Sequence, residues 1–352
     1  MSRRGLTLAV ACGLTVVLGV LAVVLPVPYV VLVPGPVTDT LGTVGGKPVV
    51  TASGARTYPT QGHLYLTTVG VIPGDCDAHP TLWQALRAWW RHDEAVQPHQ
   101  AICPPGNTAQ QVQQQNENEM SQSQRDAITA ALLELGYKPV RQTILVGGVT
   151  DGLPAAKVLQ AGDVIKSVEG AKVTSPQQLR ERIGAKPVGS SLAFVISRDG
   201  RDRTVHIRTA ASPDDAKRPV IGIETDVNAT FRGVDVTIGL DPAQVGGPSA
   251  GLAFTLGIVD KLTPGSLTGG RTVAGTGTIN AFGVVGPIGG IQQKIAGAER
   301  AGATVFLAPA SECADAKAAA PSTMTLVKVD TLHTALKALK AIDSGSTAFP
   351  HC

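Results

Sequence analysis

The chain has 352 residues, enough for about two or three domains that each bury a core. With 43% hydrophobic and 16% charged residues, the composition excludes an intrinsically disordered chain. The formal net charge is +3 and the basic residues are scattered without a Lys/Arg block, so no nucleic-acid partner is expected.

The first predicted element is an apolar run over residues 5–25, about the length that spans a bilayer. Two arginines precede it, and its residues stay bulky from Leu18 to the prolines that follow it. A cleaved signal peptide, the alternative, has a shorter apolar core and a cleavage site of small residues. We therefore predict a single-pass transmembrane signal anchor in the cell membrane, with residues 1–4 as a cytoplasmic tail and the rest of the chain outside the cytoplasm.

Extended chain, one strand and one helix are predicted next. Residues 27–50 are rich in Val, Pro and Gly, which favours extended chain, and the β-branched segment His63–Ile72 is typical of a strand. A clean helical pattern covers Ser121–Gly136. The Gln/Asn-rich residues before it extend this helix with a solvated first half, or, as the alternative, residues 104–118 are disordered.

A short helix is predicted over Leu82–Trp90, where apolar side chains recur at helical spacing. The three tryptophans of the chain lie in this segment. We expect them to pack into the core; contact with the lipid interface beside the membrane exit is the alternative.

The cysteines fit a compartment that tolerates disulfides. Cys12 lies in the apolar run, which leaves Cys76, Cys103, Cys313 and Cys352, an even number that permits several pairings. The most local arrangement joins Cys76 to Cys103 and Cys313 to Cys352, and free buried thiols are the alternative. No cysteine spacing is typical of a zinc site, so we predict no metal and no cofactor.

Residues 144–209 are predicted to form a separate compact unit. Its expected elements are strands at 144–149, 192–197 and 204–207 and a helix over 175–183. The segment Ala161-Gly162-Asp163-Val164-Ile165, followed by a Glu-Gly turn, resembles a PDZ domain of the bacterial protease type.

The resemblance implies a domain, taken as residues 139–210, that binds an extended peptide at a sheet edge beside a helix. We assign the peptide-binding segment to its first strand. The residues of this segment are Ile144, Leu145, Val146, Gly147, Gly148 and Val149.

From Arg218 onward, strands alternate with helices, which predicts a layered α/β (α+β) domain. The expected strands are 220–225, 233–240, 272–279 and 304–308, and the expected helices are 249–259, 291–301 and 332–342.

A serine stands on a glycine-flanked turn in Gly247-Pro248-Ser249-Ala250-Gly251, ahead of the first of these helices. Such a turn can present a nucleophile. The alternative is a serine that only caps the following helix. A nucleophilic serine needs a base. An α/β-hydrolase elbow would take His333, which follows Asp330, whereas a neutral lysine would serve as the base of a dyad.

Lys294 is the lysine whose position in the sequence suits the role of this base. In the predicted helix it lies three residues after Ile291 and four before Ala298, hence on the apolar face. An ammonium held in an apolar environment has a lowered pKa, which lets the amine accept a proton near neutral pH. The alternative is a side chain that extends past the small alanines to water.

Several motifs together resemble the proteolytic domain of Lon proteases. They cover most of residues 220–340 and are Gly-Pro-Ser-Ala-Gly at 247–251, Thr-Gly-Thr-Ile at 276–279, Gly-x-x-x-Pro-Ile-Gly-Gly-Ile-x-x-Lys at 283–294 and Ala-x-Arg-Ala-Gly at 298–302. The resemblance implies a Ser-Lys dyad in which Ser249 is the nucleophile, Lys294 the general base and Thr276 the residue that orients the lysine.

Gly247, Pro248 and Ala250 form the nucleophile turn, and we expect backbone N–H groups around Ser249–Ala250 to hold the oxyanion. Two residues depart from the family pattern: Gly246 stands where relatives often carry Asp, and Thr278 where they carry Glu. The acid tied to switching of the active-site loop is therefore missing, and the dyad is intact.

A Lon-type domain that started at Arg218 would lack its first strand and long helix. We therefore predict a split catalytic domain, residues 26–138 and 211–342, with the PDZ-like unit inserted and 343–352 as a tail. No ATP-binding loop accompanies it. The predicted function is a membrane-anchored, ATP-independent serine endopeptidase for unfolded or flexible extracytoplasmic substrates, with a homo-oligomer implied by resemblance; the alternative is a non-catalytic PDZ/Lon-fold binding or chaperone-like protein.

Overall fold

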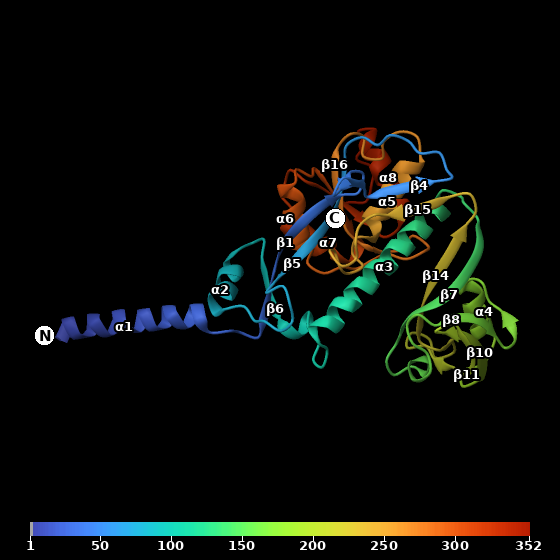
Figure 1. Cartoon of the computed structure of the whole chain (residues 1–352), viewed down its shortest axis with the longest axis horizontal. Helices are drawn as coiled ribbons and strands as arrows, with labels where there is room; N and C mark the ends of the chain where they lie inside the picture. Colours follow the sequence, from blue (N-terminus) through green and yellow to red (C-terminus); the bar gives the residue numbers. More distant parts are fainter. Residues whose placement is uncertain (1–2) are drawn as a thin grey trace.

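The computed structural model describes residues 3–352, and it begins with a helix, α1 (Arg3–Val24), that projects away from the rest of the molecule (Figure 1). Residues Arg4–Val24 are long and apolar enough to cross a membrane, and none of this helix is buried in the protein. This finding fits a membrane span or a signal sequence. Of the expected cytoplasmic tail, residues 1–2 lie outside the described residues, and Arg3 already belongs to the helix.

The main sheet joins strands from both ends of the chain. Its order is β20-β19-β16-β5-β1-β6. The strands are β1 (Tyr29–Asp39), β5 (His63–Ile72), β6 (Ala95–Pro98), β16 (Thr272–Gly275), β19 (Val305–Pro309) and β20 (Thr325–Val329). Strand β5 pairs parallel with β16 and antiparallel with β1, so the segment predicted as extended chain is a central strand, with Val30 and Val31 fully buried.

Helices cover both faces of this sheet. They are α3 (Ala109–Glu134), α5 (Gly251–Leu262), α6 (Ile291–Arg300), α7 (Cys313–Ala319) and α8 (Leu332–Asp343). Along β19, Val305 and Leu307 pack with α3, α5 and α8, whereas Phe306 and Ala308 pack with α6 and α7. Alternate side chains of a strand point to opposite faces, so a strand covered on both sides is apolar throughout.

A second sheet has the order β11-β10-β8-β7-β14. Its strands are β7 (Pro139–Val149), β8 (Val164–Val168), β10 (Ser191–Arg198), β11 (Arg201–Arg208) and β14 (Ile223–Phe231), with the two-residue β9 (Ala171–Lys172) beside β8 and helix α4 (Pro176–Gly184) against the sheet. The edge strand β14 lies beyond residue 210, so the predicted boundary at that residue divides this sheet.

The remaining elements are short. They are β2 (Thr43–Val44), β3 (Lys47–Pro48), β4 (Val50–Ser53), β12 (Ala210–Ala211), β13 (Pro219–Val220), β15 (Asp235–Ile238), β17 (Thr278–Ile279), β18 (Val285–Gly286) and helix α2 (Leu82–Trp90), with 3-10 turns at His99–Ala101, Pro154–Lys157 and Ala310–Glu312. Strand β15 pairs with β4 and leads toward Ser249.

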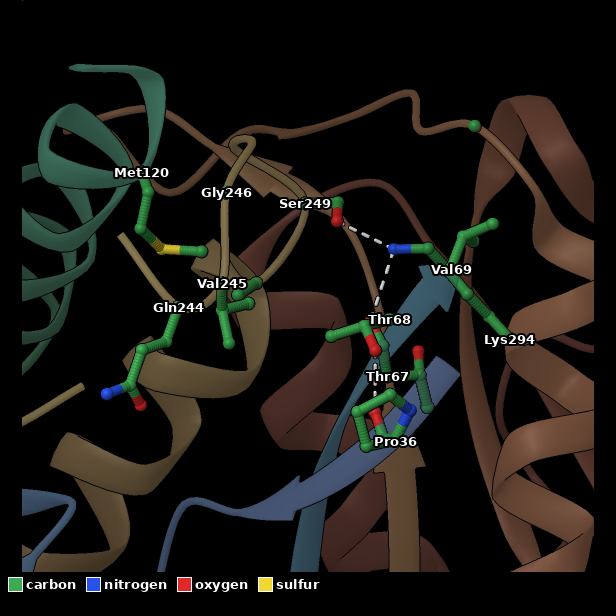
Figure 2. A pocket seen from close by; sticks show the side chains of 12 residues that line it. Pro36, Thr67, Thr68, Val69, Met120, Gln244, Val245, Gly246, Ser249 and Lys294 are labelled. Atoms are coloured by element: carbon green, nitrogen blue, oxygen red, sulfur yellow. Dashed lines mark hydrogen bonds between the residues drawn. The ribbon is translucent and has the colours of Figure 1, made fainter. Parts of the chain in front are cut away.

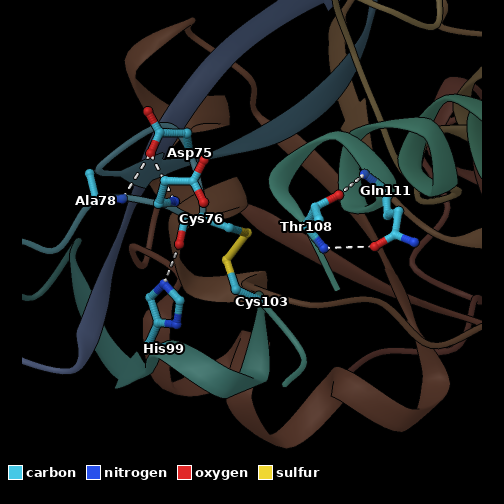
Figure 3. Close-up of a disulfide and its surroundings, with 8 residues drawn as sticks. Asp75, Cys76, Ala78, His99, Cys103, Thr108 and Gln111 are labelled. Carbon is cyan, nitrogen blue, oxygen red and sulfur yellow. Dashed lines mark hydrogen bonds between the residues drawn. A yellow bond between two sulfur atoms is a disulfide. The ribbon is translucent and has the colours of Figure 1, made fainter. Parts of the chain in front are cut away.

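Helix α3 forms over its whole predicted length, including the polar first half, and runs between the two sheets (Figure 1). It begins with a capping box: the Gln111 N–H donates to Thr108 Oγ1 at 3.2 Å, and the Thr108 N–H donates to Gln111 Oε1 at 2.8 Å (Figure 3). Disorder across 104–118, the alternative, is therefore wrong from Thr108 onward.

Helix α2 forms as predicted, but the expectation that its tryptophans pack into the core is wrong. Trp83, Trp89 and Trp90 are 56%, 77% and 88% exposed. The buried side chains of α2 are Ala85 and Ala88.

The cysteines adopt the most local pairing. Disulfides join Cys76 to Cys103 and Cys313 to Cys352, and Cys12 is unpaired in α1. The second disulfide, together with the hydrogen bond from the Lys328 N–H to the Pro350 carbonyl at 2.9 Å, fixes the C-terminal residues to β20.

Candidate active site

Ser249 lies directly before α5, on a turn that only glycines permit. Gly247 has a φ of 82°, a conformation that side chains disfavour. A Cβ on Gly251 would lie 2.8 Å from Ile279 Cγ2 and 2.9 Å from Ser123 Oγ, so a larger residue would displace the turn. The serine is thus fixed at the N-terminus of a buried helix, whose partial positive charge favours an anion there.

Lys294 comes from α6, on the opposite face of the main sheet from α5. Its helix begins after Gly290, which has a φ of 68° and packs against Val69. Ile291 and Ile295 flank the lysine on the apolar face, and only 2% of Lys294 is exposed. The side chain therefore passes into the protein and does not extend to water.

The two side chains meet beside β5 (Figure 2). Lys294 Nζ lies 2.6 Å from Ser249 Oγ, 3.1 Å from Thr276 Oγ1 and 3.2 Å from the Thr67 carbonyl oxygen. Thr276 Oγ1 donates its own proton to the Ser249 carbonyl at 3.1 Å, so it accepts from the lysine. A neutral amine has two N–H groups, and these two acceptors occupy them. Its lone pair then faces the Ser249 hydroxyl, which is the geometry of a general base.

Burial lowers the pKa of Lys294 to about 7. The charged form loses its hydration in this apolar layer, and the oxygen partners named above are neutral groups. A substantial fraction of the amine is therefore neutral at neutral pH.

The Thr67 carbonyl is a partner that sequence reasoning missed. Strand β1 bulges opposite Thr68, between Pro34 and Val37. Prolines lack an N–H, so the Pro34-Gly35-Pro36 segment offers few hydrogen-bond donors to β5. The Thr67 carbonyl oxygen instead accepts a hydrogen bond from Lys294 Nζ. Prolines inside the segment predicted as extended chain were the available signal.

Helix α3 also holds the nucleophile turn, a role that its polar sequence did not reveal. Buried Ser123 donates through Oγ to the Pro248 carbonyl at 2.9 Å, and the Gly247 N–H donates to the Asn116 carbonyl at 3.0 Å. A Cβ on Gly246 would lie 2.8 Å from Asn116 Cβ. The glycine that replaces an acid at this position therefore makes room for α3.

A cavity of about 300 Å³ opens beside Ser249 (Figure 2). Most of its walls are apolar or small, and Lys294 supplies the one basic group. The lining residues are Pro36, Thr67, Thr68, Val69, Met120, Gln244, Val245, Gly246, Ser249, Ala250, Gly289 and Lys294.

The histidine of the hydrolase alternative has other partners. His333 Nδ1 lies 3.2 Å from Glu134 Oε1 of α3, and the ring is exposed. Asp330 accepts a hydrogen bond from the Thr334 hydroxyl at 2.6 Å. Ser249 is therefore bonded to a lysine, and neither residue of the hydrolase pair contacts it.

The predicted peptide-binding segment Ile144–Val149 needs correction. It lies in β7, which pairs with β14 along residues 144–149 and with β8 at Ile144 and Leu145. A strand paired on both sides cannot accept a peptide by strand addition. The edge strands of this sheet are β11 and β14, and α4 packs beside β14.

No group of three or more His, Cys, Asp or Glu within residues 3–352 could hold a metal ion.

Two family models match the chain. A model of the PDZ domain matches residues 119–209, and a model of the Lon protease (S16) C-terminal proteolytic domain matches residues 205–341. The chain therefore carries a PDZ domain and a Lon-type proteolytic domain.

Similar proteins include proteases of both kinds. Lon protease 1 of Bacillus subtilis (strain 168) is 38% identical over 96 residues, which are 27% of this chain and 12% of that protein. The periplasmic serine endoprotease DegP of Escherichia coli (strain K12) is 31% identical over 118 residues, 32% of this chain and 25% of DegP. The chain thus spans a quarter or less of these relatives. The solved PDZ domain of the SdrC-like protein of Listeria monocytogenes is 30% identical, covers 23% of this chain and 85% of that chain, and has a TM-score of 0.22.

The burial of Lys294 should reduce stability in a pH-dependent way. The unfolded chain binds the lysine proton more tightly than the folded protein does. The free-energy cost of burying Lys294 therefore has its full size below pH 7, and it vanishes as pH rises toward the ordinary lysine pKa of 10.5. We expect Lys294→Met to raise the free energy of unfolding by on the order of 3–5 kcal/mol near pH 6, and progressively less as pH rises. Denaturant melts across pH measure this difference. The exposed Lys337→Met on α8 is the matched control, and an equal effect of both variants would contradict the argument.

Proposed function

We propose that the chain is a membrane-anchored, ATP-independent serine endopeptidase with a Ser249–Lys294 dyad. The observation that carries the proposal is the 2.6 Å contact between Lys294 Nζ and Ser249 Oγ, made by an amine whose two N–H groups are already engaged. A binding protein gains nothing from a buried lysine that destabilises its fold, so this arrangement favours an enzyme over the non-catalytic alternative.

The reaction follows from this geometry. Lys294 takes the hydroxyl proton as Ser249 attacks the scissile carbonyl carbon, and the ammonium then protonates the leaving amine as the C–N bond breaks. Backbone N–H groups at Ser249 and Ala250, at the N-terminus of α5, stabilise the oxyanion. The same lysine then activates a water molecule, which hydrolyses the acyl-enzyme and restores the serine.

The cavity beside Ser249 favours a small or medium apolar side chain next to the scissile bond. Val69, Met120 and Val245 supply apolar walls, and about 300 Å³ leaves room for one such side chain. A substrate carboxylate would lose its hydration there without a matched pair of donors.

The PDZ domain supplies a second contact for the substrate. We place the extended peptide at the edge of β14, beside α4, and treat residues 139–210 with β14 as a unit inserted into a catalytic domain built from 26–138 and the C-terminal part. The strand order of the main sheet supports this split, since all its strands lie within residues 29–98 or within residues 272–329. Extended or unfolded proteins are the substrates that fit strand addition.

The anchor is α1. The Leu25 carbonyl at its end accepts the Leu82 N–H at 2.9 Å, so the end of this helix belongs to the folded domain, which favours retention over cleavage. With Arg3 and Arg4 at the start of this helix, the chain would place its catalytic part outside the cytoplasm. A homo-oligomer is part of the proposal by resemblance alone.

Substitution of either dyad residue should abolish peptide hydrolysis. Ser249→Ala removes the nucleophile, and Lys294→Met keeps the buried volume while it removes the base, so we expect losses of at least about 10³-fold in kcat for each. Hydrolysis of an unfolded, fluorophore-labelled protein by the detergent-solubilised full chain measures this. Near-normal turnover by either variant, with its fold verified by circular dichroism, would rule out the dyad.

The pH dependence should follow the lysine. Because burial lowers the pKa of Lys294 to about 7, kcat/KM should rise with pH through that value and level off above it. A pH profile from acid to mildly alkaline conditions tests this. A rise centred near the ordinary lysine pKa would show that Lys294 is not the base in the free enzyme.

Ser123 should act as a positioning residue through the Pro248 carbonyl. Loss of this buried hydrogen bond in Ser123→Ala should lower kcat by roughly fivefold with little change in KM, because about 1 kcal/mol of support for the turn is lost. Ser121→Ala on the same helix is the matched control. Equal kinetics of the two variants would show that the turn needs no support from α3.

A further inference from the structure

All three tryptophans of the chain face solvent from one short helix. Trp83, Leu86 and Trp90 recur at helical spacing and Trp89 adjoins them, on the side of α2 away from Ala85 and Ala88. We call Trp83, Leu86, Trp89 and Trp90 the tryptophan face. Large aromatic side chains are rarely left in water on a monomer without a partner.

The tryptophan face begins where α1 ends. The Leu82 N–H donates to the Leu25 carbonyl at 2.9 Å, and the Val27 N–H donates to the Pro80 carbonyl at 3.0 Å. A capping box between Thr81 and Gln84 starts α2 at this junction. The chain at the end of α1 and the chain at the start of α2 are thus joined by backbone hydrogen bonds, and the two helices adjoin in Figure 1.

The loops on either side of α2 are also fixed. The Cys76–Cys103 disulfide joins the segment before α2 to the segment after it, and His99 Nε2 lies 3.1 Å from the Cys76 carbonyl oxygen (Figure 3). The His99 N–H donates to the Pro28 carbonyl at 3.1 Å, at the start of β1. The position of α2 relative to the end of α1 is therefore set by the fold.

The length of α1 defines the depth of this junction. The candidate span has 21 residues, which at ~1.5 Å per residue give about 31 Å, close to the ~30 Å of a hydrocarbon core. If α1 crosses the bilayer, Leu25 and the start of α2 lie at the outer interface. Tryptophan is enriched at this depth, where its ring is partly apolar and its N–H can reach water.

The charges beside the tryptophan face are already paired. Arg87 lies 3.5 Å and Arg91 2.9 Å from the carboxylate of Glu94. The face therefore offers apolar area without a free basic cluster, and it does not need anionic lipid.

We propose that the tryptophan face lies in the outer interface of the membrane that α1 spans, so that α2 is a second membrane contact that fixes the orientation of the catalytic domain. This inference rests on the proposed anchoring by α1. It places the β6 edge of the main sheet beside the bilayer and the PDZ domain at the far end of the molecule (Figure 1).

The intrinsic fluorescence of the full chain tests this, because every tryptophan belongs to α2. In vesicles of zwitterionic phosphatidylcholine, we expect blue-shifted emission, stronger quenching by a lipid-borne quencher near the headgroup than by one at the chain end, and weak quenching by aqueous iodide. Strong iodide quenching would overturn the proposal. Protection from both iodide and the lipid quenchers would overturn it too, by showing that a second copy of the chain covers the face.

A matched control moves the tryptophan. The variant W83Q/W89Q/W90Q/V188W carries a single tryptophan at a 40% exposed position between α4 and β10, in the domain opposite α1 (Figure 1). Its iodide quenching should be several-fold stronger than that of the native chain. An alkaline carbonate wash separates the two hypotheses: release from vesicles refutes anchoring and this proposal together, whereas retention with iodide-quenched native tryptophans refutes this proposal alone.

Discussion

The candidate site depends on the burial of one amine, that of Lys294, in an apolar layer of the protein. Lys294 meets three oxygens that come from β5, from the residue after β16 and from the turn before α5. Thr67 is 227 residues away from the lysine in sequence, so the contacts exist only when both ends of the chain have assembled the main sheet. The burial of the amine lowers the pKa of Lys294, and the apolar packing of α6 against the sheet offsets the free-energy cost of that burial.

The sequence predicted the parts of the fold and of the candidate site that local patterns encode. The helix over Leu82–Trp90 matches α2 in both bounds, and the apolar spacing around Lys294 correctly indicated its burial. The proximity of Ser249, Lys294 and Thr276 came from a resemblance carried by motifs, and the structure brings the three together. Such motifs are short and continuous, so they can be recognised in the sequence without knowledge of the tertiary fold.

Features that depend on tertiary contacts were not predictable. The Thr67 carbonyl is a backbone group that any residue carries, and its contact with the lysine depends on how β1 and β5 pair beside the bulge. The peptide edge was assigned to Ile144–Val149 because a strand looks alike in sequence whether it is central or at the edge; pairing with β14, which follows much later in the chain, decides this. The tryptophans were expected inside because hydrophobicity predicts burial in general, whereas the buried side of α2 consists of Ala85 and Ala88.

Helix α3 links the two domains through adjacent residues. Ser123 contacts the nucleophile turn, while Gln122 donates to the Asp226 carboxylate of β14. Burial and the neighbouring Asp226 carboxylate raise the pKa of Asp126, one turn further along the helix, so a protonated carboxyl is stable at this contact. Because β14 also continues through β15 to Ser249, the edge strand reaches the active site by two routes, along the chain and through α3.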